Sequence, residues 1–198
     1  MEQYHCDPES RDWYDNTPLL EACRCRCLAV VEVLLTTQDC STVCNNVSRI
    51  PLHYSCRHGW LDVTRRLVEE YHCDPESGDW EGDTPLQEAC REGHVNIVRY
   101  LVSERGCSTA CHNKNGNTPL HGACREGRVD IVRYLVSEVG CRTAYRNKNG
   151  NTPMHEACRW NKTEVDSTQE KQESRSHDQR GVGGMRGGLG AGYGGRDQ

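Results

Sequence analysis

Cysteine is the residue type in this chain with the widest choice of chemistry, because thiols bind zinc, form disulfides and act as nucleophiles. The chain has fourteen cysteines in 198 residues. No C-x-x-C pair occurs, although zinc sites usually show that spacing; the nearest cluster, Cys23, Cys25 and Cys27, alternates with arginines. Ten of the fourteen instead recur at fixed positions, which favours small buried packing residues over a metal site or a disulfide ladder. These two series are Cys23, Cys56, Cys90, Cys124 and Cys158, and Cys6, Cys40, Cys73, Cys107 and Cys141.

Histidine is the next candidate for chemistry. His53, His121 and His155 occupy the same place in a recurring tetrapeptide. A catalytic histidine needs a nucleophile and an orienting acid beside it, and the sequence offers repeated histidines rather than one such constellation. No phosphate-binding loop or nucleophile elbow is present either. We therefore predict no enzymatic activity, no catalytic residues, no metal and no cofactor.

The elements that carry these residues repeat along the chain. The phrase DTPLQEACREGHVNIVRYLVSERGC returns as NTPLHGACREGRVDIVRYLVSEVGC, and weaker copies stand earlier and later. Successive copies start 33 and then 34 residues apart. The positions that anchor them are Thr17, Ile50, Thr84, Thr118 and Thr152.

Local signals predict two short helices in each copy. A threonine followed by proline suits a helix start. Gly93 and Gly127 stand where one helix must reverse into the next, and Asn-Gly at 115–116 and 149–150 marks tight turns. Arg26 occupies the reversal position in the first copy. Because a left-handed conformation is costly for arginine, we expect that copy to be locally rearranged or frayed.

This period and motif resemble the ankyrin repeat. The resemblance implies an all-α solenoid of stacked helix-turn-helix units with short hairpin or loop fingers. The expected ankyrin repeat domain covers residues 1–160, followed by a disordered polar and Gly-rich tail at 161–198. Within the domain we expect a half repeat at 1–15, repeats at 16–48, 49–82, 83–116 and 117–150, and a half repeat at 151–160. The motif histidine implies a hydrogen bond that ties neighbouring repeats, so Leu20 and Gln87, which replace it, predict looser joints.

The resemblance also implies a protein or peptide partner, bound by the finger tips and the exposed face of the first helices. An arginine at every first helix points to an acidic partner. The alternative is local pairing with Glu21, Glu88 and Glu156, each three residues earlier. The tip tryptophans suggest interface anchors, unless each covers its own loop. The expected contact residues are Trp13, Tyr14, Arg24, Arg57, His58, Trp80, Glu81, Arg91, Glu92, Lys114, Asn115, Arg125, Glu126, Lys148 and Arg159.

Other functions stay open as alternatives. Arg-Gly pairs in the tail suggest an RNA-associated protein, but the tail is electrically neutral and the chain has a net charge of −5, so nucleic acid is not favoured. The break within the last repeat also fits a truncated, non-functional fragment of a longer array. We expect no small-molecule substrate, no membrane span and no signal peptide, and hence a cytoplasmic or nuclear location.

Overall fold

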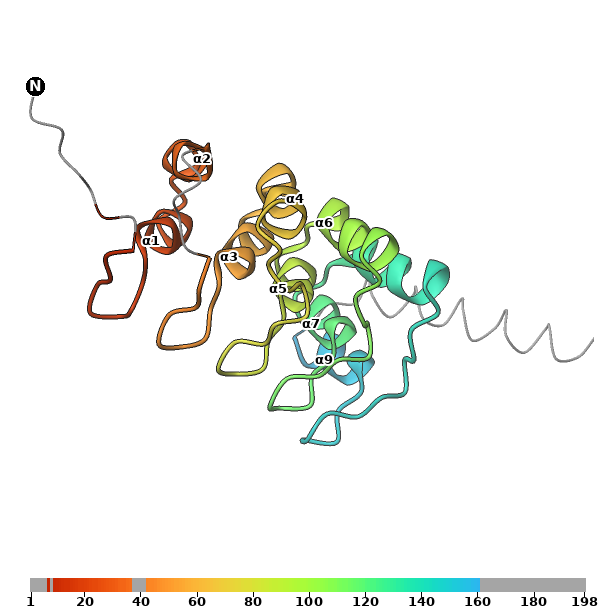
Figure 1. Cartoon of the computed structure of the whole chain (residues 1–198). Helices are drawn as coiled ribbons and strands as arrows, with labels where there is room; N and C mark the ends of the chain where they lie inside the picture. The colour runs from red at the N-terminus through yellow and green to blue at the C-terminus, as the bar shows by residue number, and fades with distance from the viewer. Residues whose placement is uncertain (1–6, 8, 37–41, 161–198) are drawn as a thin grey trace, which may run out of the picture.

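The structure is a computed structural model, which describes residues 7, 9–36 and 42–160. Within these residues it consists of helices and the loops that join them, with the helix pairs stacked side by side in one curved row (Figure 1). The expected all-α stack is therefore confirmed. The tail at 161–198, with its proposed disorder and RNA contacts, lies outside the described residues, as do Cys6 and Cys40.

Each helix pair consists of a short first helix and an antiparallel second helix. In the third and fourth pairs the second helix ends in a π-helical turn, at Tyr100–Glu104 and Tyr134–Glu138. The last first helix has no second helix among the described residues. The α-helices are α1 (Pro18–Arg24), α2 (Leu28–Thr36), α3 (Pro51–His58), α4 (Leu61–Glu69), α5 (Pro85–Glu92), α6 (Val95–Arg99), α7 (Pro119–Arg125), α8 (Val129–Arg133) and α9 (Pro153–Arg159).

The Thr-Pro pairs start the first helices as predicted. Thr84 is the N-cap of α5, and its hydroxyl accepts a hydrogen bond from the backbone N–H of Gln87 at 3.4 Å. In return, the backbone N–H of Thr84 donates to Oε1 of Gln87 at 2.9 Å. This reciprocal pair satisfies two N–H groups that a helix start otherwise leaves unpaired.

The reversal between the two helices of a pair uses a left-handed residue. Gly59, Gly93 and Gly127 have φ values of 81°, 97° and 69°, and Arg26 adopts the same conformation with φ 61°. The turn around Arg26 is otherwise ordinary, because the N–H of Cys27 donates to Ala22 at 2.9 Å, as Arg128 does to Ala123 at 2.8 Å. Of the two expectations for the first repeat, local rearrangement is wrong at this turn, because Arg26 adopts the conformation of the glycines, and fraying stays a prediction.

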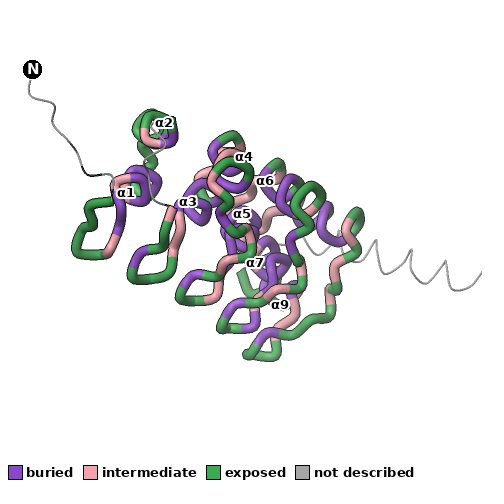
Figure 2. Tube along the Cα trace, viewed as in Figure 1, coloured by how far each residue is buried: buried purple, intermediate pink, exposed green. Residues whose placement is uncertain are grey.

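The apolar core runs as a continuous seam between the helices (Figure 2). Six of the repeated cysteines belong to this seam, and Cys141 packs against it. Cys23, Cys56, Cys90 and Cys124 are fully buried. Burial raises the pKa of the Cys56 thiol to about 12, so this thiol stays neutral and unreactive. The packing interpretation is confirmed for these four positions and for the buried Cys73 and Cys107, but it is wrong for Cys158, which is exposed on the last described helix.

Candidate protein-binding surface

The finger tips project together along one side of the stack, where the chain is largely exposed (Figures 1 and 2). Backbone hydrogen bonds join each tip to the next. Trp80 donates to the carbonyl oxygen of Val47 at 2.9 Å, Lys114 to that of Glu81 at 2.8 Å, and Lys148 to that of Asn115 at 3.0 Å. The tips therefore form one connected edge rather than independent loops.

A side chain at the base of each finger fixes its turn. Oδ1 of Asn113 accepts hydrogen bonds from the backbone N–H groups of Asn115 and Asn117, both at 3.0 Å. Its Nδ2 donates to Asp83 of the preceding finger at 2.7 Å. Asn147 makes the matching bonds one repeat later, including one to Asn117 at 2.8 Å. These bonds set the fingers in place before any partner arrives.

Aromatic side chains stand exposed on this edge. Trp13 is 99% exposed, Tyr14 67% and Trp80 63%. Trp13 therefore covers no loop of the described chain. Trp80 makes one local contact, with the Lys114 ammonium 5.1 Å from its ring centroid. Glu81, Asn115 and Lys148 are also exposed at the tips, so the edge is aromatic toward the N-terminus and more basic toward the C-terminus.

The arginines of the first helices do not form an open row of cations, because several of them pair with nearby carboxylates. Arg24 donates to both carboxylate oxygens of Glu21, at 2.7 and 2.5 Å. Arg91 pairs with Asp83 at 2.5 Å and lies 3.6 Å from Glu88. The Arg91 side chain, expected on the exposed face, is only 30% exposed, because its ion pair with Asp83 at the finger base holds it inward. Local pairing therefore accounts for Arg24 and Arg91.

The other arginines have different neighbours. Arg57 lies 3.5 Å from Glu92 of the next repeat. Arg125 lies 3.3 Å from Glu126 and 5.4 Å from the ring centroid of Trp160. Arg159 is exposed, and no ion pair joins it to Glu156 among the described residues. The Glu156 carboxylate instead accepts hydrogen bonds from Asn147 at 3.1 Å and Asn151 at 2.9 Å.

A buried charge cluster beneath this face was missed from the sequence. Glu88, expected on the exposed helix face, is 0% exposed, and Arg49 donates to it at 3.1 Å and to Asp79 at 3.0 Å. Asp83 pairs with Arg91 from the other side. Burial raises the pKa of Glu88, and Oε2 of that carboxylate has no hydrogen bond among the described residues. The three buried carboxylates, Asp79, Asp83 and Glu88, lie close together, and the guanidinium groups of Arg49 and Arg91 pair with them. Arg49, at a position where the other repeats have Asn or Asp, is the signal that could have revealed the cluster.

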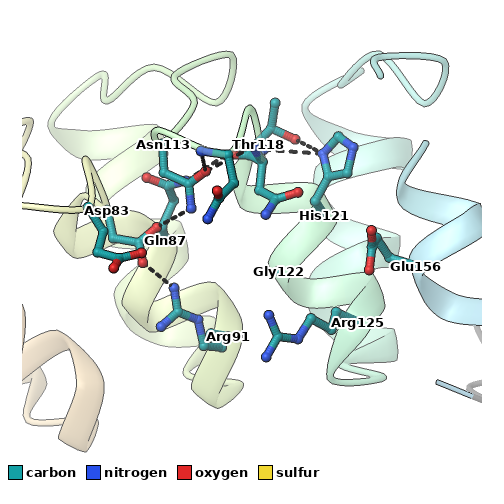
Figure 3. A pocket seen from close by; sticks show the side chains of 12 residues that line it. Asp83, Gln87, Arg91, Asn113, Thr118, His121, Gly122, Arg125 and Glu156 are labelled. Atoms are coloured by element: carbon teal, nitrogen blue, oxygen red, sulfur yellow. Dashed lines mark hydrogen bonds and ion pairs between the residues drawn. The ribbon is translucent and has the colours of Figure 1, made fainter. Parts of the chain in front are cut away.

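A small polar pocket opens between α5 and α7 (Figure 3). Its volume is about 160 Å³, and Gly122 lies at its centre, where the neighbouring repeats place Glu88 and Glu156. A Cβ built on Gly122 would meet nothing within 4 Å. Arg125 extends across the space below Gly122 toward Arg91 (Figure 3). The missing side chain is thus the origin of the pocket.

Among the residues that the structure describes, no helix combines the length and apolar character needed to cross a membrane.

Comparison with known proteins agrees with this architecture. A family described as "Ankyrin repeats (3 copies)" matches residues 37–110 and 105–166. NF-kappa-B inhibitor alpha from Homo sapiens is 42% identical to this chain over 71 residues, and the proteins of that name from Rattus norvegicus and Mus musculus are 41% identical. Each alignment covers 32% of this chain and 22% of the relative, so the chain spans about a fifth of the length of these relatives.

Proposed function

Because the chain belongs to the ankyrin repeat family, whose members generally mediate protein–protein interactions and are typically non-catalytic, we propose that it is a binding module for another protein. The partner contacts the finger tips and the exposed face of the first helices. Catalysis has no part in this function.

One observation carries the proposal: large aromatic side chains stand exposed on fingers that are already fixed. Exposing Trp13, Tyr14 and Trp80 to water is unfavourable, and interface hot spots are enriched in tryptophan and tyrosine. The hydrogen bonds between fingers limit the conformational entropy that the tips would lose on binding. An edge of this kind suits a partner with an apolar pocket for the aromatic rings.

Charged residues beside the aromatic edge extend the proposed surface and favour an acidic partner. Arginine binds carboxylates through paired N–H groups, and Arg24, Arg57, Arg125 and Arg159 are all exposed, whereas Arg91 is partly buried. The full proposed surface includes Trp13, Tyr14, Arg24, Arg57, His58, Trp80, Glu81, Arg91, Glu92, Lys114, Asn115, Arg125, Glu126, Lys148 and Arg159.

We further propose that the protein works inside the cell, in the cytoplasm or the nucleus. Reducing compartments keep thiols out of disulfides, and the exposed Cys25, Cys27 and Cys44 form no disulfide with the described residues. The names of the human, rat and mouse relatives make NF-kappa-B a first protein to test as a partner.

Affinity capture with the full chain as bait tests the function. The matched bait carries Trp13→Ala and Trp80→Ala, which remove exposed rings and should leave thermal stability unchanged. A protein retained by the wild-type bait and lost from the alanine bait would support the fingers as the binding edge. Recovery of RNA alone, in a salt-sensitive manner, would favour the RNA-associated alternative. A chain without a cooperative helical melt would favour the non-functional fragment.

A further inference from the structure

A second pocket lies near the N-terminal end of the stack and is strongly basic. Its volume is about 390 Å³, and its lining includes Arg24, Arg26, Arg57 and His58. Tyr54 and Glu92 complete the lining. The lining therefore carries three guanidinium groups and one carboxylate, an excess of two positive charges. Glu21 pairs with Arg24 from outside the lining, and the arginines still outnumber the carboxylates.

Arg26 is the residue that distinguishes this pocket from its counterparts. The later repeats have Gly59, Gly93 and Gly127 at the same place, so only the first repeat adds a cation there. Arg26 holds a left-handed conformation that arginine adopts at a cost. Its side chain makes no ion pair or hydrogen bond with the described part of the chain. A guanidinium is thus placed at the pocket without an internal partner.

The remaining wall is polar and well supported. The His58 ring lies between the rings of Tyr54 and Trp60, with centroid distances of 6.4 and 5.1 Å. Its Nε2 has no hydrogen-bond partner among the described residues. Arg57 is held only loosely, at 3.5 Å from Glu92. The pocket therefore presents guanidinium groups from the end of α1, from the turn that follows it and from α3 around one space.

We propose that this pocket binds the phosphate group of a phosphorylated serine or threonine in the partner protein, an inference that rests on the proposed protein-binding function. A phosphorylated side chain carries a charge of about −1.5 to −2 at pH 7, which favours a site where three guanidinium groups face the two carboxylates of Glu21 and Glu92. It also offers three acceptor oxygens, to Arg26 and to the N–H groups of Arg24 and Arg57 that their carboxylate partners leave unused, whereas a carboxylate offers two in one plane. Arginine clusters are a recurrent means of recognising phosphorylated segments.

The test uses the full chain and three short peptides that differ only at their central residue: phosphoserine, glutamate or serine between glycines. Binding is followed by NMR titration of the backbone and arginine N–H signals. We expect saturable shifts around Arg26 and Arg57 with the phosphoserine peptide, at least tenfold weaker binding of the glutamate peptide, and none with serine. Equal binding of the first two peptides, or no saturation at millimolar phosphoserine peptide, would overturn the phosphate assignment.

Matched variants locate the site. Arg26→Gly restores the residue of the other repeats, so it should fold and should weaken phosphopeptide binding at least tenfold. The control is Arg133→Gln, which changes an arginine that is 62% exposed on α8 and should leave binding unchanged. Equal binding by Arg26→Gly and wild type would contradict the inference.

The inference and the proposed function fail in different ways. If a captured partner binds Arg26→Gly and wild type equally, and still binds after phosphatase treatment, the protein-binding function stands and the phosphate site is wrong. If the phosphopeptide binds as expected but capture yields no protein, the proposed function is the part in doubt.

Discussion

The side chain of Gln87 donates a hydrogen bond through Nε2 to the carbonyl oxygen of Asn117, 2.8 Å away in the next repeat. His53 makes the same connection to Asp83, and His121 to Asn151, both at 3.1 Å. In each case the other polar atom of the side chain accepts a hydrogen bond from the N-cap backbone. The expectation that Gln87 loosens its joint is therefore wrong, because an amide offers the same donor and acceptor as a neutral imidazole.

Replacing Gln87 tests this joint. Gln87→Ala should lower the free energy of unfolding by about 1–3 kcal/mol, because it leaves a buried N–H and a carbonyl group without partners. Gln87→His should retain most of the stability, since it restores the residue of the neighbouring repeats. Chemical denaturation of both variants checks this, and equal losses in the two would contradict the shared role.

Removing the strained conformation of Arg26 should stabilise the first helix pair. Arg26→Gly relieves a left-handed arginine, which costs roughly 1–2 kcal/mol, although part of the gain is offset by the greater freedom of glycine in the unfolded chain. Hydrogen exchange of the amides in α1 and α2 measures the effect locally. Gly93→Arg is the reciprocal change and should destabilise its repeat. A faster exchange in Arg26→Gly would show that the arginine stabilises the turn.

Filling the pocket at Gly122 should stabilise α7. Gly122→Ala should add about 0.5–1 kcal/mol, because glycine is unfavourable inside a helix and a Cβ meets no atom here. Gly122→Glu should match or exceed alanine, since its carboxylate can reach Arg125 three residues later, a pairing of about 0.2–0.5 kcal/mol.

Varying the ionic strength separates the gain in helix preference at position 122 from the gain due to an ion pair with Arg125. The advantage of Gly122→Glu over Gly122→Gln should shrink in high salt, whereas the gain of Gly122→Ala should not. Thermal melts at low and high ionic strength give this comparison. A glutamate variant less stable than wild type at low salt would mean that the carboxylates of Asp83 and Glu156 dominate the pocket.

The buried carboxylate of Glu88 makes the free energy of unfolding depend on pH in a known direction. Burial raises its pKa in the folded state above the ordinary value of 4.5. The folded protein therefore holds this proton more tightly than the unfolded chain, and stability is lost as pH rises through 4.5 and the higher folded pKa. Glu88→Gln removes that titration, so its stability relative to wild type should increase from pH 4 to pH 7.

Urea unfolding of wild type and Glu88→Gln at several pH values checks this difference. The comparison cancels the other carboxylates, such as Glu21 and Glu138, whose lowered pKa values give the opposite trend. If the stability of Glu88→Gln relative to wild type instead fell with rising pH, Arg49 and Arg91 would stabilise the charged form of Glu88 more than burial disfavours it.

The sequence was sufficient for the features that repetition encodes. The helix starts at Thr84 and the buried cysteines follow from residue type and period alone. The conformation of Arg26 was harder to predict, because the free-energy cost of a left-handed arginine depends on whether the neighbouring helices hold the turn. Glu88 was misplaced for a related reason: Arg49, 39 residues earlier, pairs with it only in the stack. Gly122 stands where neighbouring repeats have Glu88 and Glu156, but that difference alone did not predict a pocket, whose walls come from side chains of several repeats.

Photo-crosslinking from a finger tip tests the central claim most directly. A photoreactive phenylalanine analogue replaces Trp80 in the full chain, and in a matched variant it replaces Arg133, which is exposed on α8. If the finger edge is the binding surface, a partner protein will crosslink to position 80 and not to position 133. Crosslinking at position 133 with none at position 80 would place the partner on the second helices and contradict the account.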